Sequence, residues 1–248
     1  MLHVAAPRLE AEELSDQLPP AEPRAAPPAP PLAWIMLAIA GLIAAALLAL
    51  KVRDGGPLGW DRAIILALRT PGDNAQPIGP AWLHEVMVNV TALGSGTVLT
   101  IVVVAIVGLF LVQRLWLTAA LVAVATLLGS GIAAQAKYWV GRPRPDLVDH
   151  LVQVTGLSFP SGHATNSAIV YLTLAGLVAQ VTRGRSTRLY VLVLAMLLAG
   201  AIGCSRVYLG VHWPSDVLAG WCAGTGWAAM WWWIGAAVRQ RLAARRSR

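Results

Sequence analysis

The sequence predicts an all-α integral membrane protein with six transmembrane helices, and three observations lead to this prediction. Of the 248 residues, 57% are hydrophobic and only 12% are charged, whereas a soluble domain carries about 25% charged residues. The apolar residues occur in runs close to the roughly 20 residues that a helix needs to cross the hydrocarbon core. Short polar segments separate these runs, so we expect one membrane domain over residues 32–238.

The two ends of the chain differ from this domain in composition. Residues 1–31 contain eight of the sixteen prolines and show no hydrophobic period, which predicts a disordered cytoplasmic tail. This segment lacks the basic start and the cleavage site of a secretory signal, so we expect no cleavage. Residues 239–248 contain five arginines, which is typical of a cytoplasmic tail beside anionic lipid. The net charge of +7 could suggest a nucleic-acid partner. Because many of the cations are placed as in a membrane flank, we expect no nucleic-acid partner.

The expected spans are residues 32–50, 86–112, 115–136, 162–181, 189–204 and 214–238. In the connection at 51–85, residues 61–68 could form a short helix on the membrane surface, although a plain connector is the favoured interpretation. Gly220 and Gly224 form a small-xxx-small pair that predicts a helix-packing face. Tryptophans near span ends predict an interfacial belt; they are Trp34, Trp116, Trp139, Trp213 and residues 231–233. Cys204 and Cys222 are interpreted as packing residues, with no disulfide or metal role.

The distribution of cations predicts how the domain is oriented in the cell membrane. Arg114, the basic loop at 183–188 and the C-terminal arginines fall on one side of the six expected spans. By the positive-inside rule this side, which also holds both termini, is cytoplasmic. Lys51 and Arg53 run against this assignment.

The first of three polar clusters follows the third span. Lys137, Arg142 and Arg144 lie within eight residues, and Pro143 and Pro145 stiffen the turn. An ordinary basic flank should be cytoplasmic, yet this cluster falls on the opposite side. This mismatch favours a functional role.

The second cluster is Pro160-Ser161-Gly162-His163, which leads directly into the fourth span. Ser161 is expected to cap the helix, and Gly162 lets a ligand approach the backbone. The free N–H groups of a helix start bind anions, and a histidine there can exchange a proton near neutral pH. A simple capped helix start remains an equally good interpretation of this cluster alone.

The third cluster lies between the fifth and sixth spans and includes Ser205, Arg206, His212 and Asp216. His212 and Asp216 are one helical turn apart and can share a face. A carboxylate beside a histidine fixes the tautomer of the ring and stabilises its cation. Arg206 can hold an oxyanion in a bidentate fork.

Two crossings separate the third cluster from the other two, so all three should lie on the same face of the membrane. The resulting pocket is electropositive, with two histidines and a helix start, and this combination suits phosphoryl transfer. We expect His212, supported by Asp216, to attack phosphorus, and His163 to protonate the leaving oxygen and then activate water. A metal site on Asp146, Asp149 and His150 is disfavoured because the loop lacks a carboxylate-rich cage, so we expect no cofactor. His3 and His84 are interpreted as ordinary surface residues.

These residues resemble the three-part signature of the type 2 phosphatidic acid phosphatase superfamily. Lys137 with Arg144-Pro145, residues 160–163, and Ser205-Arg206 with His212 and Asp216 all fall at the spacing of that family. Arg142-Pro143 is a second Arg-Pro pair at the wrong spacing. The resemblance implies six helices, an extracytoplasmic site and a phosphohistidine intermediate formed without metal. It implies His212 as nucleophile and His163 as acid and base, with phosphate bound by Lys137, Arg144, Ser161, Gly162 and Arg206.

The sequence therefore predicts a membrane phosphatase that acts on a lipid phosphate or diphosphate, of the phosphatidate or polyprenyl diphosphate class. Two alternatives stay open: a lipid phosphotransferase that uses the same site, and a catalytically silent transporter or scaffold. The identity of the lipid and the oligomeric state do not follow from the sequence.

Overall fold

The fold is almost entirely helical, as a computed structural model shows for residues 32–53, 56–182 and 184–246. The expected disordered tail at 1–31 lies outside the described residues. The helices are α2 (Leu32–Val52), α3 (Gly59–Ala67), α4 (Ala81–Ala92), α5 (Gly96–Val112), α6 (Trp116–Val140), α7 (Gly162–Val181), α8 (Arg185–Tyr208) and α9 (Pro214–Arg246). Strands β1 (Arg69–Thr70) and β2 (Asp73–Pro77) form an antiparallel hairpin. This hairpin is a small departure from the all-α prediction.

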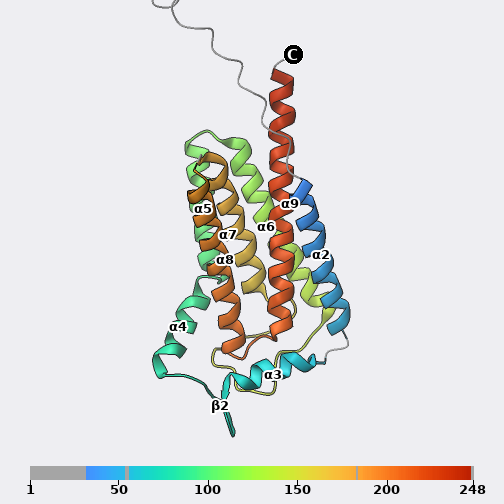
Figure 1. Ribbon diagram of the computed structural model, residues 1–248, viewed down its shortest axis with the longest axis vertical. Coiled ribbons are helices and arrows are strands. Elements are labelled where there is room, and N and C mark those ends of the chain that lie inside the picture. The colour runs from blue at the N-terminus through green and yellow to red at the C-terminus, as the bar shows by residue number, and fades with distance from the viewer. Residues whose placement is uncertain (1–31, 54–55, 183, 247–248) are drawn as a thin grey trace, which may run out of the picture.

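The long helices run side by side as a bundle, and α7 lies at its centre (Figure 1). Helices α8 and α9 pack on α7, and α2 packs along the outer side of α9. Helix α6 also contacts α7 and carries α5 on its other side. Helix α3 and the hairpin lie across the end of the bundle opposite the C-terminus (Figure 1). The bundle therefore has one end covered by α3 and loops, and another end from which α9 projects.

The main differences from the predicted helices are a broken span, an additional helix and a longer last helix. The second expected span is broken at 93–95 into α4 and α5, which meet at a bend of 45°. Ser95 starts α5 by accepting a hydrogen bond from the Val98 amide at 3.3 Å, so a capped second helix begins where one continuous helix was expected. The connection at 51–85 contains the helix α3, so the favoured interpretation as a plain connector was wrong. Helix α9 continues to Arg246 instead of ending at residue 238.

Helices α2, α6 and α8 are each long and apolar enough to cross a membrane, and the bent pair α4–α5 adds a fourth candidate span. Large apolar side chains cover the outer faces of these helices, including Leu47, Val104, Leu127 and Leu197, each more than 60% exposed. Such a surface suits lipid and is unfavourable in water. The molecule is therefore a helical membrane protein with three to four candidate spans among its described residues.

The small-residue face predicted on α9 is confirmed as a packing face. A Cβ atom added to Gly224 would lie 2.6 Å from Ala168 Cβ and 2.7 Å from the Thr165 carbonyl oxygen, both on α7. A Cβ atom on Gly220 would lie 3.0 Å from the Ser161 carbonyl oxygen. The two glycines thus let the backbones of α7 and α9 approach closely, and this approach places the first turns of both helices together.

The tryptophans of the predicted belt differ in exposure. Trp34 and residues 231–233 are half-buried, and Trp34 packs edge-on against Trp232. Trp116 and Trp139 are 63% and 86% exposed, as an interfacial position requires. Trp213 is only 2% exposed, and its indole N–H donates to the Pro143 carbonyl oxygen at 3.2 Å. The interfacial prediction was therefore wrong for Trp213, because the loop that carries it folds back into the bundle.

The close approach of α7 and α9 leads to a prediction for Gly224→Ala. The new methyl group would meet backbone of α7 and force the helices apart, which should cost about 1–3 kcal/mol of unfolding free energy. We expect a lower melting temperature in detergent, measured by intrinsic tryptophan fluorescence. The matched control is Gly108→Ala on α5, where a Cβ atom meets nothing within 4 Å and where alanine favours the helix. A Gly224→Ala protein that melts at or above the control would contradict this packing.

Candidate active site

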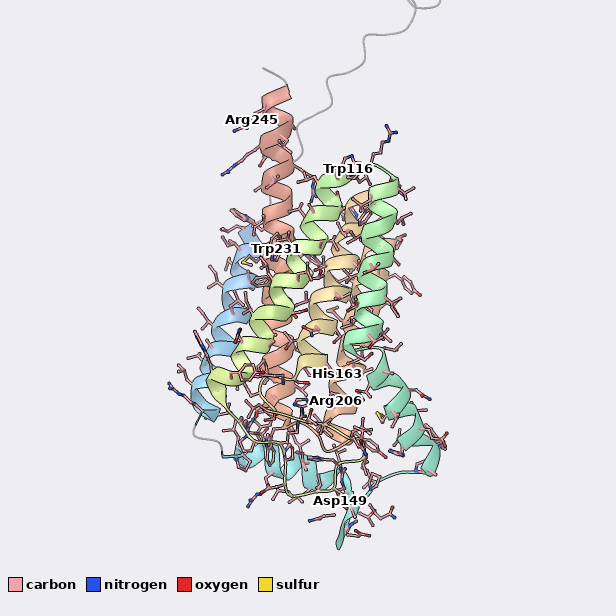
Figure 2. The ribbon with its side chains drawn as sticks, turned by 180° about the vertical axis from the view of Figure 1, so that it is seen from behind. Trp116, Asp149, His163, Arg206, Trp231 and Arg245 are labelled. Carbon is pink, nitrogen blue, oxygen red and sulfur yellow. The ribbon has the colours of Figure 1, made fainter. Side chains whose placement is uncertain are left out.

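The three polar clusters meet at the end of the bundle that α3 covers, where Figure 2 shows His163 and Arg206 side by side, far from Trp116 and Arg245. The Lys137 ammonium donates to the Pro160 carbonyl oxygen at 2.8 Å and so joins the first cluster to the second. The Ser161 amide donates to the Asp216 carbonyl oxygen at 3.1 Å and joins the second cluster to the third. The three loops thus form a single site.

Lys137 lies in the last turn of α6, which ends at Gly141 in a left-handed conformation (φ 67°). Besides Pro160, its ammonium contacts the carbonyl oxygen of Leu157 at 3.1 Å. Among the described residues these two contacts occupy two of its three N–H donors, so one donor remains available. Gly162 lies directly beside this side chain, since a Cβ atom there would be 3.9 Å from Lys137 Cε.

The guanidinium of Arg144 is fixed by backbone oxygens of its own loop and of the third cluster. It donates to the carbonyl oxygens of Gly156 and Thr155, each at 3.0 Å, and of Val211 at 2.8 Å. Its Nη1 also lies 3.3 Å from His212 Nε2. Because a guanidinium can only donate, this contact favours the tautomer in which Nε2 carries the lone pair and Nδ1 carries the proton.

Ser161 occupies the N-cap position of α7, but its hydroxyl does not cap the helix as predicted. The side chain is fully buried, and its Oγ has no partner among the described residues. A buried hydroxyl without a partner is unfavourable unless a ligand completes it. Ser161 therefore keeps an unused hydroxyl beside the amides at the start of α7, a position that can bind an anion.

His163 is half-buried in the first turn of α7. Its ring lies against the bend between α4 and α5, since a Cβ atom on Gly94 would be 3.5 Å from His163 Cδ2. The hydroxyl of Tyr171 donates to the Leu93 carbonyl oxygen at 2.8 Å and fixes this bend. Lys137, Arg144, Arg206 and His212 all lie close enough to act electrostatically on His163.

Arg206 lies near the end of α8 and is only 4% exposed. Its Nη1 donates to Thr91 Oγ1 on α4 at 3.0 Å, whereas its Nε has no partner among the described residues. A buried guanidinium with unused donors is poised to bind an anion. The break in the second expected span therefore has a role, because α4 brings Thr91 to this arginine.

His212 is 2% exposed and lies in the loop before α9. Its Nδ1 is 3.5 Å from Asp216 Oδ2, which is too long for a well-formed hydrogen bond. Burial lowers the pKa of His212 to about 4, and the nearby Asp216 carboxylate only partly offsets this effect. The ring is therefore neutral near pH 7, with a lone pair on Nε2.

The structure separates one cation from the pocket and adds three supporting residues that lie outside the predicted clusters. Arg142 does not line the pocket, because it is fully buried and paired with Asp61 and Asp216. Asp61, Arg69 and Thr91 come from the connection and from α4, outside the three clusters. Arg69 donates to the Tyr208 carbonyl oxygen at 3.0 Å and so holds the loop that leads to His212. Each is a polar residue next to or within an apolar run, and that position is the only signal the sequence offers.

The disfavoured metal site does not assemble in the described segments. His150 Nε2 lies 2.8 Å from the Pro145 carbonyl oxygen. Within residues 32–53, 56–182 and 184–246, no group of three or more His, Cys, Asp or Glu side chains is placed to hold a metal ion. Asp146, Asp149 and His150 therefore do not form a ligand set.

The burial of His212 leads to a prediction about its titration. We expect a midpoint of about 4 by NMR of labelled histidine in detergent, with the signal assigned by its loss in His212→Ala. In the unfolded chain the ring takes up its proton near pH 6.5, so the folded state should lose stability as the pH falls from 6.5 towards 4. A midpoint at or above 6.5 would contradict the neutral, buried ring.

Comparisons with known proteins identify several similar chains. The chain is 36% identical over 148 residues to phosphatidylglycerophosphatase B of Bacillus subtilis, covering 58% of this chain and 70% of that protein. It is 36% identical over 115 residues to a decaprenylphosphoryl-5-phosphoribose phosphatase of Mycobacterium tuberculosis, covering 45% and 56% of the two chains. A crystal structure of a transmembrane PAP2-type phosphatidylglycerolphosphate phosphatase from Bacillus subtilis superposes with a TM-score of 0.65 at 31% identity, over 80% of this chain and 93% of that one.

The PAP2 superfamily itself matches residues 114–240, a segment that contains all three polar clusters. The matched segment covers half of the chain. The chain also aligns with more than two thirds of the Bacillus subtilis phosphatidylglycerophosphatase B at 36% identity. On these grounds the chain belongs to the PAP2 superfamily.

Proposed function

We propose that this protein hydrolyses a phosphomonoester or diphosphate of a membrane lipid through a phosphohistidine formed at Nε2 of His212. The observation that carries the proposal is the contact between His212 Nε2 and Arg144 Nη1 at 3.3 Å. A neutral imidazole whose lone pair faces an anion-binding guanidinium is placed to attack a phosphorus atom held by that guanidinium.

The two chemical steps can be assigned to the two histidines. His212 Nε2 forms a bond to phosphorus while the bond between phosphorus and the lipid oxygen breaks. His163, whose protonated form is favoured by the negative charge of the bound phosphate, gives its proton to that oxygen. Neutral His163 then takes a proton from water, which attacks phosphorus and breaks the phosphorus–nitrogen bond. Inorganic phosphate leaves, and both histidines return to their starting states. The Asp216 carboxylate offsets the positive charge of the phosphorylated ring.

The phosphoryl oxygens would be held by donors that keep unused N–H or O–H groups among the described residues. These are the third N–H of Lys137, the remaining Nη2 N–H of Arg144, the guanidinium of Arg206, the Ser161 hydroxyl and the amides at the start of α7. Donors fixed before the substrate arrives stabilise the charge that spreads over the phosphoryl oxygens in the transition state.

An apolar groove next to the site supports a lipid as the substrate. The groove has a volume of about 270 Å³ and lies between α2, α6, α7 and α9. Its lining includes Ala46 on α2, Ala133 on α6, and Pro160, whose carbonyl oxygen also binds Lys137. Small and apolar walls suit a hydrocarbon chain, so the headgroup can reach the site while the chain stays in the groove.

The relatives support the same class of substrate, since their names describe phosphatases of phosphatidylglycerophosphate, decaprenylphosphoryl-5-phosphoribose and undecaprenyl diphosphate. We further propose six membrane spans, with the pair α4–α5 counted as one and with α7 and α9 included. The positive-inside rule then places the C-terminal arginines in the cytoplasm and the site on the extracytoplasmic face.

The first prediction of this proposal concerns the two histidines. His212→Ala and His163→Ala should each lower the release of phosphate from phosphatidate or a polyprenyl diphosphate by about 10³-fold or more, with little change in melting temperature. His84→Ala, outside the three clusters, is the matched control. Activity should persist in EDTA. A His212→Ala protein with near-normal turnover, or a wild-type enzyme that EDTA abolishes, would contradict the mechanism.

The second prediction concerns the groove. Ala46→Trp should fill it and raise the KM for a long-chain lipid phosphate by about tenfold, while activity on a short-chain water-soluble analogue should change little. Ala40→Trp is the matched control, because it places the same side chain on α2 outside the groove. Equal effects of Ala46→Trp on both substrates would show that the groove does not hold the lipid chain.

A further inference from the structure

A buried chain of three charged residues lies at the base of the site, and the mechanism uses only Asp216 of the three. Arg142 is fully buried and bridges two carboxylates that are also fully buried. Its Nη1 donates to Asp216 Oδ1 at 2.6 Å, and its Nη2 donates to Asp61 Oδ2 at 2.8 Å. The guanidinium lies 5.4 Å from the centre of the Trp213 ring, so the bridge is shielded from water on that side. Charges this deep are retained only when they are paired.

Asp61 also holds the start of α9, where Asp216 lies. Its Oδ1 accepts the Ser215 amide at 2.8 Å, and its Oδ2 accepts the Ser215 hydroxyl at 2.6 Å. The Ser215 amide is one of the donors that a helix start leaves without an intrahelical partner. Asp61 therefore caps α9 from another helix, and it fixes the residue that precedes Asp216.

Helix α3 carries Asp61 and is anchored in the core, so the bridge has a fixed base. Ile65, one turn after Asp61, is completely buried in a cluster with Trp213, Val217 and Ala164. In Figure 1, α3 lies across the end of the bundle, below α9. This helix lies outside the segment that matches the PAP2 superfamily, residues 114–240.

The two oxygens of Asp216 have different tasks. Oδ1 is taken by Arg142, whereas Oδ2 accepts the Trp213 amide at 3.0 Å and faces His212 Nδ1 at 3.5 Å. Arg142 thus decides which way the carboxylate is turned towards His212. The same guanidinium would neutralise the carboxylate if it had no second partner, because both groups lie in an interior of low dielectric constant. Asp61 supplies that partner and leaves a net negative charge on the three residues.

We propose that Asp61 and Arg142 are positioning residues for the pair His212–Asp216, and that α3 is therefore a functional part of the enzyme. The proposal rests on the proposed role of His212 as nucleophile. Arg142 orients the carboxylate, and Asp61 preserves the charge with which this carboxylate stabilises the phosphorylated ring. Neither residue contacts the substrate.

The test uses the full-length protein in detergent, with phosphate release from dioctanoyl phosphatidate as the readout. In Asp61→Asn the guanidinium of Arg142 acts on Asp216 alone, so kcat should fall about 10²-fold. KM should change less than about threefold, because Lys137, Arg144 and Arg206 are untouched. Asp73→Asn, in the exposed hairpin of the same connection, should leave both constants unchanged.

A double variant separates this role from simple support of the fold. Asp61→Asn with Arg142→Gln removes one negative and one positive charge and leaves Asp216 with its own. We expect its kcat to lie at least about fivefold above that of Asp61→Asn, because the negative charge of Asp216 is no longer neutralised by Arg142. Its kcat should stay at least about fivefold below wild type, because no guanidinium orients the Asp216 carboxylate. A purely structural role predicts instead that the second substitution lowers activity further.

Three results would overturn the proposal: an Asp61→Asn enzyme with more than half of the wild-type kcat, a double variant slower than Asp61→Asn, or a double variant as fast as wild type. Should Asp61→Asn fail to fold, the double variant decides the question through its kcat relative to wild type. Activity of wild type together with inactivity of His212→Ala tests the proposed function separately, so a failure of one proposal is distinguishable from a failure of the other.

Discussion

The carboxylate and carbonyl oxygens of Asp216 hold together the parts of the chain that form the site. The carbonyl oxygen accepts the amide of Ser161 at the start of α7. One carboxylate oxygen accepts from Arg142 after α6, and the other lies between the Trp213 amide and His212. Three segments that are distant in the sequence thus meet at one acidic residue. Every donor in this arrangement is buried. Removal of the Asp216 carboxylate would therefore take an acceptor from both Arg142 and the Trp213 amide.

The cations of the site are fixed by neutral acceptors, in contrast to Arg142. Lys137 and Arg144 are held by backbone carbonyl oxygens, and Arg206 is held by a threonine hydroxyl. A carboxylate partner would cancel the charge that a phosphoryl group requires, whereas a carbonyl oxygen orients the cation and leaves its charge in place. Under the proposed function, positive charge has two uses: Arg142 is paired with carboxylates, and the other three cations remain available for an anion.

The sequence predicted the meeting of the three clusters better than it predicted the helices. Lys137, His163 and His212 lie at or near the ends of consecutive helices, and the bundle brings these ends together. The role of Asp61 could not be predicted, because its partner Arg142 lies 81 residues later and no periodic pattern links them. The break at Gly94 could not be predicted either. Apolar composition indicates how long a span is, but it does not indicate where the helix bends. The sequence also left the place of Arg142 open, because an Arg-Pro pair is the same in sequence whether its guanidinium faces a ligand or the core.

The position of α2 has a consequence for the way a substrate reaches the site. This helix packs along α9 and makes few contacts with α6, and the apolar groove lies between them. A lipid that enters through this gap keeps its hydrocarbon chain in an oily environment throughout its approach. The lipid then reaches the enzyme by diffusing in two dimensions within one leaflet. The fraction of sites that hold a lipid depends on the mole fraction of that lipid in the leaflet.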